Sequence, residues 1–238
     1  MESDATVYIC VIGDSGVGKT SLITAAATET FPDRPPPVLP AAKLPADTTP
    51  EGVPVVITDT SSRPEDKQAL EQAAREANVI VLCFSMENPQ SLRRVSTHWM
   101  PELRRLGISV PIILVGCKSD IRPADQSLHQ VSRGIQLLSV RTILPEQLIL
   151  VEYDNKKDIV PTMQAVLPIV KTYSQIETCM ECSSKKLQFV GEVFYYALKS
   201  VLHPMAPLYE PDSRQLQPLC TRALKRIFLA CDADMMGF

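Results

Sequence analysis

The chain has 238 residues, of which 45% are hydrophobic and 21% charged, so it can bury a sizeable core and is typical of a soluble globular protein. The formal net charge is -3 and the pI is near 5.7, so the sequence has no overall attraction to nucleic acid. It also has no basic stripe, which argues against a nucleic-acid-binding function. The seven cysteines are scattered, which indicates a reducing compartment, and no apolar run approaches the roughly 18 residues of a membrane-spanning segment.

Short β-branched runs alternate with longer segments of helical periodicity, and this pattern predicts a parallel sheet wrapped by helices. The predicted strands cover 7–12, 53–59, 78–85, 110–117 and 176–182. The predicted helices cover 18–28, 65–76, 89–105, 161–173 and 187–202. Because ligands of such sheets bind at the carboxyl ends of the strands, we expect the functional site at that edge.

Two segments interrupt the alternation. Residues 32–50 contain seven of the 20 prolines, which predicts a stiff loop or a weak edge strand. Residues 121–158 show no clear periodicity over a length that is uncommon for a connection inside a compact domain. We interpret 121–158 as an insertion; its apolar patches would either form an extra hairpin or not pack at all.

The first predicted strand runs into "GDSGVGKTS", which fills the G-x-x-x-x-G-K-[ST] pattern of a phosphate-binding loop before a helix. Its glycines let backbone N–H groups point at phosphate oxygens, Lys19 would reach the β and γ phosphates, and the Thr20 hydroxyl would bind Mg²⁺. A glycine-rich turn without a ligand is the less favoured alternative. The predicted nucleotide-binding residues here are Gly13, Asp14, Ser15, Gly16, Val17, Gly18, Lys19, Thr20 and Ser21.

Two further loops predict a pocket for guanine. "CKSD" at 117–120 follows one predicted strand, and "SSK" at 183–185 follows another. The carboxylate of Asp120 can accept hydrogen bonds from both N1–H and N2–H of guanine, a donor pair that adenine lacks. Lys118 would cover the base with its aliphatic stem, and Ser183 and Ser184 would complete the pocket, the latter through its backbone N–H. K-x-D alone is a weak motif, but it gains weight from the phosphate-binding loop.

With these motifs the sequence resembles the Ras-like small GTPases, and more closely the N-terminal GTPase domain of the Miro family of mitochondrial Rho-type proteins. The closer resemblance lies in "LPADTTPEGVP" at 44–54, "IETCMECS" at 176–183, "EVFYYALKSVLHPMAPLY" at 192–209 and "ALKRIFLACDAD" at 223–234. It implies a Ras-like P-loop fold of class α/β, with a six-stranded, mostly parallel sheet and about five helices. It also implies GTP and GDP as ligands and Mg²⁺ as the cofactor.

For hydrolysis, the resemblance implies catalytic roles for Lys19, Thr20 and Asp59, with Thr20 and Asp59 as the metal ligands. After Asp59 the family pattern D-x-x-G-Q is replaced by "DTSSR", so Ser62 stands at the glycine position and Arg63 at the position of the water-orienting glutamine. We therefore expect slow hydrolysis of GTP, and we give Arg63 either a role as a cation in the transition state or, preferably, none.

Other departures from the family pattern concern binding. The proline run 35–37 falls where relatives keep a Mg²⁺-binding threonine, and Thr48 and Thr49 suit a hairpin turn better. Ser15 replaces a glycine and would crowd an arginine supplied by a partner. Cys117 replaces the asparagine of N-K-x-D, which removes one bracing amide.

Two rival functions stay open on the sequence alone. "DTSSR" favours a GTP-bound interaction module that does not hydrolyse its ligand. An ATP-dependent P-loop kinase or ATPase is disfavoured by "CKSD" and by the lack of an arginine-rich lid.

The sequence predicts a GTPase domain over 1–203, followed over 204–238 by a linker and the entering helix of a truncated EF-hand. Asp232 and Asp234 would occupy the first two ligand positions of its loop, but Met236 stands at the third, so we expect no complete Ca²⁺ site. The resemblance implies motor-adaptor partners and the cytosolic face of the mitochondrial outer membrane. Without an anchor, the chain alone would be cytosolic.

Overall fold

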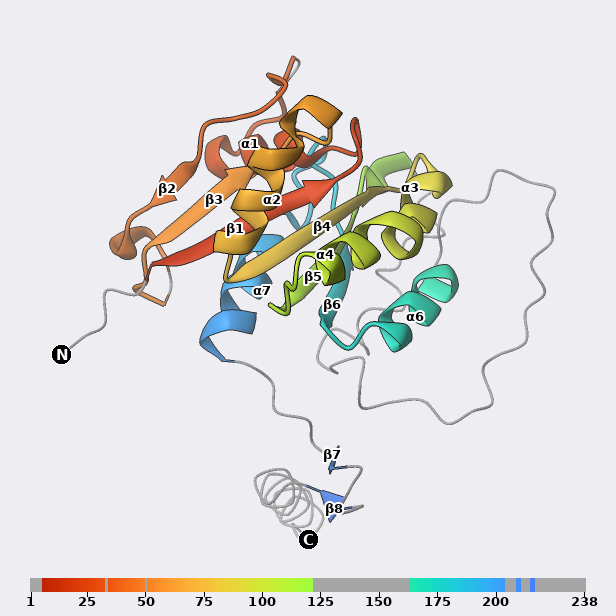
Figure 1. The fold of residues 1–238 in the computed structure, drawn as a ribbon. Helices are drawn as coiled ribbons and strands as arrows, with labels where there is room; N and C mark the ends of the chain where they lie inside the picture. Colours follow the sequence, from red (N-terminus) through yellow and green to blue (C-terminus); the bar gives the residue numbers. More distant parts are fainter. Residues whose placement is uncertain are drawn as a thin grey trace, which may run out of the picture.

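The computed structural model describes residues 6–32, 34–49, 51–121, 163–203, 209–210 and 215–216. Six strands form one sheet in the order β2-β3-β1-β4-β5-β6 (Figure 1). Strand β2 is antiparallel to β3, whereas all other neighbours in this sheet are parallel. The strands are β1 Val7–Gly13, β2 Ala42–Leu44, β3 Val55–Asp59, β4 Val79–Ser85, β5 Ile112–Cys117 and β6 Ile176–Glu181.

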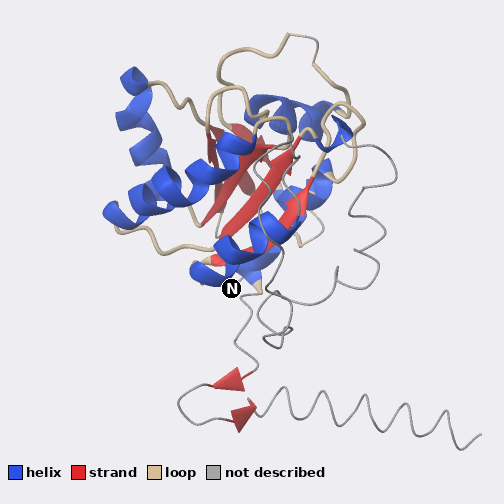
Figure 2. Cartoon of the chain, turned by 90° about the vertical axis from the view of Figure 1, so that its right-hand side faces the viewer, coloured by secondary structure: helices blue, strands red, loops and turns tan. Residues whose placement is uncertain are grey.

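Helices cover both faces of this sheet, as Figures 1 and 2 show. Helices α1 and α7 pack on one face, and α2, the α3–α4 segment and α6 pack on the other. The helices are α1 Lys19–Thr28, α2 Lys67–Glu76, α3 Pro89–Arg94, α4 Met100–Arg105, α6 Met163–Thr172 and α7 Val190–Leu202. The predicted fold class, a Ras-like α/β sheet of six mostly parallel strands, is confirmed.

The central strands are buried on both faces because consecutive side chains point to opposite sides of the sheet. Val11 faces α1 and α7, whereas the next residue, Ile12, packs in the cluster under α2 and α3–α4. Val81 and Leu82 in β4 repeat this division. Each such fully buried side chain contributes about 1.5–3 kcal/mol of transfer free energy, so the sheet is a rigid base for the loops at its edge.

Prolines explain two shifted strand starts and one helix irregularity. The strands predicted to begin at 53 and 110 begin at Val55 and Ile112, directly after Pro54 and Pro111, which have no N–H for the ladder. The helix predicted over 89–105 is continuous but contains a π-helical turn at Val95–Trp99. Pro101 follows that turn, and because its ring cannot accommodate a regular i−4 hydrogen bond, the shift of register fits its position.

The proline-rich segment 32–50 forms the weak edge strand that was one of its two interpretations, since β2 has only three residues. The insertion predicted over 121–158 lies outside the described residues, except for Ile121. Within 204–238 only a hairpin of β7 Tyr209–Glu210 and β8 Gln215–Leu216 is described, so the predicted EF-hand helix is outside as well. No helix in the described part of the chain has the length and apolar character to cross a bilayer.

Candidate functional site

The loop between β1 and α1 has a conformation that its glycines make possible. Gly16 and Gly18 have φ angles of 75° and 112°, in the region that side chains disfavour. At Gly13 (φ 142°) a Cβ atom would lie 2.3 Å from the carbonyl oxygen of Cys83 on the neighbouring strand β4. Only glycine fits there, and the loop therefore starts in close contact with the end of β4.

Lys19 begins α1 and folds back over this loop. Its Nζ donates to the backbone carbonyls of Gly13 at 2.8 Å and Asp14 at 2.9 Å, and the residue is only 7% exposed. Burial lowers the pKa of Lys19, while the nearby Cys83, Asp59 and Asp14 oppose that shift. A buried ammonium group at the mouth of a glycine loop is suited to a polyanionic ligand.

The side chains of Thr20 and Asp59 meet where β3 ends. The Thr20 hydroxyl donates to Oδ2 of Asp59 at 2.8 Å, and the backbone N–H of Leu39 donates to the same oxygen at 3.0 Å. Oδ1 of Asp59 is buried and has no hydrogen-bond partner among the described residues. An unpartnered carboxylate oxygen beside a hydroxyl is a suitable donor set for Mg²⁺, which prefers oxygen ligands.

The segments before and after β3 contain the residues that differ from the family motifs. Thr49 lies in the turn between β2 and β3, where its hydroxyl accepts from Val53 N–H at 2.9 Å, so the expected hairpin turn is confirmed. Thr60 is buried and donates to the carbonyl of Val11 at 2.7 Å. Arg63 is exposed and precedes a 3₁₀ turn that leads into α2.

The carboxylate of Asp14 turns away from the loop toward the α3–α4 segment. Its Oδ1 accepts from Nε of Arg94 and from Nε1 of Trp99, both at 2.9 Å. Trp99 ends the π-helical turn and is 4% exposed, whereas Arg94 stands one residue before that turn. The pairing neutralises a negative charge that would otherwise face a phosphate ligand.

The two loops of the predicted base pocket are connected to each other. The Ser183 hydroxyl donates to Oδ1 of Asp120 at 2.7 Å, and the backbone N–H of Ser119 donates to the carbonyl of Cys182 at 3.1 Å. Lys118 has a left-handed backbone (φ 63°), and its Nζ pairs with Glu87 at 2.7 Å. The carboxylate of Asp120 is therefore held in a fixed orientation by a buried serine.

Cys117 lies between the predicted base pocket and the glycine loop that joins β1 to α1. It is 1% exposed and lies under Gly18, where an added Cβ would be 3.4 Å from the Cβ of Cys117. The thiol thus fills the space below the loop by packing, in place of a hydrogen-bonding amide.

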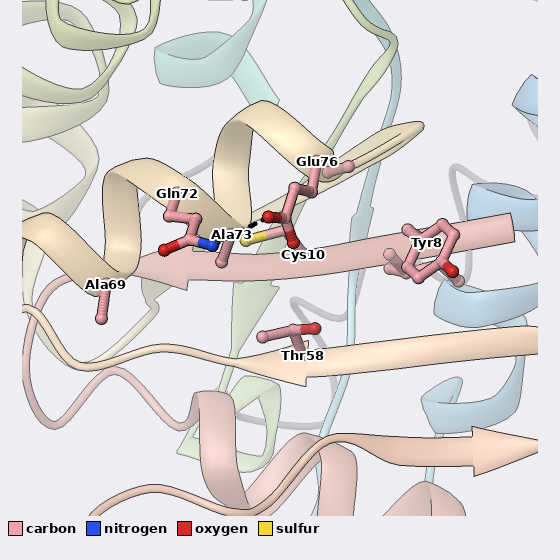
Figure 3. Close-up of a pocket in the computed structure, with 9 residues that line it drawn as sticks. Tyr8, Cys10, Thr58, Ala69, Gln72, Ala73 and Glu76 are labelled. Atoms are coloured by element: carbon pink, nitrogen blue, oxygen red, sulfur yellow. Dashed lines mark hydrogen bonds between the residues drawn. The ribbon is translucent and has the colours of Figure 1, made fainter.

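A separate cavity of about 180 Å³ lies between α2 and strands β1 and β3 (Figure 3). Its lining includes Tyr8, Cys10, Thr58, Gln72 and Glu76, and Gln72 donates to Glu76 at 3.0 Å. Burial raises the pKa of Cys10 to about 12, so this thiol is an inert packing group. None of these residues belongs to the loops described above.

Comparison with known proteins agrees with this geometry. Residues 8–203 match the family described as the Ras family. The chain belongs to the Ras family. Members bind guanine nucleotides with Mg²⁺ and hydrolyse GTP.

Three relatives carry a more specific name. The chain is 44% identical over 235 residues to Mitochondrial Rho GTPase 1 of Arabidopsis thaliana and 41% identical over 232 residues to Mitochondrial Rho GTPase 2 of that organism. It is 38% identical over 231 residues to Mitochondrial Rho GTPase 1 of Mycosarcoma maydis. These matches cover 99%, 98% and 97% of this chain but 31%, 31% and 27% of the relatives, so the chain spans about a third of their length.

In this Ras-family chain, the predicted site residues lie at the carboxyl ends of β1, β3, β5 and β6, along one edge of the sheet. The sequence does not predict the contacts of Asp14 with Arg94 and Trp99, or the position of Cys182 beside Cys117. Helical periodicity could not place Arg94 and Trp99 together, because the π-helical turn between them shifts the register. The hydroxyl of Ser183 was the one signal in the sequence for a partner of Asp120.

Proposed function

We propose that this chain binds GTP and GDP along the described edge of the sheet and hydrolyses GTP slowly. The observation that carries this proposal is the hydrogen bond of 2.7 Å from Ser183 to Asp120, close to the glycine loop that holds Lys19. A fixed carboxylate provides the paired acceptors that guanine requires, and the loop provides the cation that phosphates require.

In this proposal the phosphates bind over the glycine loop, and Lys19 exchanges contacts with its own loop for contacts with phosphate oxygens. The residues of this part are Gly13, Asp14, Ser15, Gly16, Val17, Gly18, Lys19, Thr20 and Ser21. Thr20 and Asp59 would hold Mg²⁺, which when bound neutralises charge that develops on the phosphate oxygens. Lys118, Asp120, Ser183 and Ser184 form the guanine pocket.

Hydrolysis is slow because the segment after Asp59 has no glutamine side chain that could orient the attacking water. Ser62 and Arg63 replace the residues that family members use, Arg63 is exposed, and the hydroxyl of Thr60 already donates to Val11. The remaining contributions to catalysis are the binding of the nucleotide, the position of Mg²⁺ and the positive charge of Lys19. These contributions act by positioning and electrostatics.

Binding and hydrolysis are tested on the full chain with purified variants. Calorimetry with Mg²⁺ should show binding of GTP and GDP, and Lys19→Ala should abolish it or weaken it at least about 100-fold, since the phosphates lose a buried cation. Lys43→Ala, in edge strand β2, is the matched control and should bind normally. Undiminished affinity in the Lys19 variant would refute the proposal.

The exposed position of Arg63 favours a second candidate function, a GTP-bound interaction module without hydrolysis. Single-turnover assays separate the two, since the module releases no phosphate. If the enzyme interpretation holds, Arg63→Ala should leave the rate within about threefold, whereas a tenfold fall, about 1.4 kcal/mol of barrier, would instead assign Arg63 a role in the transition state.

The names of the relatives support a wider proposal. We place this GTPase in mitochondrial transport and organisation at the cytosolic face of the outer membrane, with motor-adaptor proteins as partners. The proposed domains are those predicted from the sequence: a GTPase domain over 1–203, and a linker with an EF-hand helix over 204–238. Ca²⁺ has no part in this proposal, because Met236 replaces an oxygen ligand after Asp232 and Asp234.

A further inference from the structure

Three buried thiols gather beneath the glycine loop, at the edge of the sheet that carries the site. They are Cys83 in β4, Cys117 in β5 and Cys182 directly after β6, with 1%, 1% and 0% of their surface exposed. All three belong to the hydrophobic cluster on the α1 and α7 face. The proposed function uses none of these thiols.

Cys117 and Cys182 are direct neighbours across two strands. Gly116 pairs with Glu181, and the backbone N–H of Cys182 donates to the carbonyl of Gly116 at 2.9 Å, so the ladder continues by one residue and sets Cys182 opposite Cys117. Their sulfur atoms are 4.0 Å apart. Cys83 is opposite Val115 instead and is therefore only a diagonal neighbour of Cys117.

This arrangement is compatible with a disulfide. Neighbouring strands lie about 4.8 Å apart, and disulfides join residues whose Cα atoms are roughly 4.4–6.8 Å apart. The sulfur atoms would have to approach from 4.0 Å to about 2.05 Å. Rotation of the two side chains and a small shift of the loops after the strands would be sufficient.

The surroundings also favour the thiolate that such chemistry needs. Hydrogen bonds from the thiols of Cys182 and Cys83 hold the pKa of Cys117 well below its ordinary value, against the effect of burial, and Lys19 and Lys118 add positive charge nearby. The same contacts raise the pKa of Cys182 and Cys83. Because Cys117 is the thiol that both other cysteines contact, we assign the nucleophilic attack to it.

We propose that Cys117 and Cys182 form a reversible disulfide under peroxide, and that this disulfide weakens guanine-nucleotide binding. The Cys117 thiolate attacks one peroxide oxygen, the O–O bond breaks, and the departing oxygen leaves as water after protonation. Cys182 then attacks the resulting sulfenic sulfur, its proton and the S–OH group leave as a second water, and the S–S bond forms. A dithiol reverses the reaction by thiol exchange.

The effect on binding rests on the proposed function and follows from the neighbours of the two cysteines. The side chain of Cys117 supports Gly18 at the start of α1, and the chain continues from Cys117 directly into Lys118 and Asp120. Ser183, which orients Asp120 at 2.7 Å, is next to Cys182. A bond between the two sulfur atoms displaces both loops. The carboxylate of Asp120 then loses its alignment, and the affinity for guanine nucleotides falls.

The test uses the full reduced chain, loaded with a fluorescent GDP analogue and treated with hydrogen peroxide. Non-reducing peptide mapping should show a cross-link from Cys117 to Cys182, and nucleotide dissociation should accelerate about tenfold, a loss of about 1.4 kcal/mol, with recovery in dithiothreitol. Cys182→Ala should abolish both effects. Cys179→Ala is the matched control and should retain both, and it also identifies which cysteine of the tryptic peptide 172–185 is linked.

Several outcomes overturn the proposal. A cross-link from Cys117 to Cys83 or Cys179, or none at all, contradicts the disulfide, and a correct cross-link with unchanged dissociation contradicts its effect on binding. Thermal melting of Cys182→Ala and Cys182→Ser shows whether either variant is folded, and one folded variant is sufficient. If the reduced chain binds no guanine nucleotide, the proposed function and the effect on binding both fail, while peptide mapping still decides the cross-link.

Discussion

At the scale of a single residue, Asp14 shows how the chain tolerates a negative charge in the glycine loop that is proposed to bind phosphates. Its side chain is 18% exposed, and the carboxylate accepts hydrogen bonds from Arg94 and Trp99, both at 2.9 Å. The guanidinium compensates the charge of the carboxylate, and the indole N–H fixes its direction. We therefore regard Arg94 as a positioning residue for the loop, which it influences through Asp14.

Replacing Arg94 should make this charge harmful. Arg94→Gln leaves Asp14 negative beside the phosphates, and calorimetry should show the affinity for GDP falling about three- to tenfold through like-charge repulsion. Adding Asp14→Asn to that variant should restore affinity, because the repelling charge is gone. Arg93→Gln, an exposed neighbour on the same helix, is the control. A double variant as weak as Arg94→Gln alone would show that charge is not the cause.

At the scale of elements, an ion-pair network joins α2 to α4. Arg105 pairs with Glu71 at 2.7 Å and with Glu102 at 2.8 Å, while Lys67 pairs with Glu102 at 3.2 Å. Arg105 and Lys67 lower the pKa of Glu102 to about 2. Because this pKa is depressed on folding, the network stabilises the fold fully above pH 4.5 and loses this effect as the pH falls from 4.5 toward 2.

Arg105→Gln should loosen α2 without unfolding the protein. The side chains of Arg105 and Lys67 are 53% and 61% exposed, so solvent screens these ion pairs and the expected loss of stability is small. Hydrogen exchange at pH 7 should become faster in residues 67–76 and stay unchanged in β4. Arg93→Gln serves again as the control. Equal exchange in α2 of the variant and the original chain would show that these pairs do not restrain it.

At the scale of the whole molecule, the sheet could be predicted because its central strands are buried on both faces and the β-branched runs are easy to detect. Edge strand β2 was only one of two options, since prolines surround its three residues. What escaped prediction depends on contacts between distant parts of the chain. Asp14 meets a side chain 80 positions later, and Cys117 meets one 65 positions later, and neither pair has a local signature.

The predicted insertion at 121–158 leads to a deletion experiment. Strands β5 and β6 pair directly, and α6 packs into the core through Val166, Ile169 and Val170. Replacing residues 121–158 by a short Gly/Ser linker should therefore leave the melting temperature within a few degrees and preserve GDP binding, as expected for a surface excursion. An insoluble product, or one without affinity for GDP, would show that the removed segment is structural.

The central claim is that the chain selects guanine through the carboxylate of Asp120, and calorimetry of the full chain with GTP, ATP and XTP tests it most directly. We predict binding of GTP without measurable binding of ATP. In Asp120→Asn, GTP affinity should fall at least about 100-fold while XTP binds, since an amide can donate to the added oxygen of xanthine. ATP binding as tight as GTP binding, or an Asp120→Asn variant with unchanged preference, would contradict the claim.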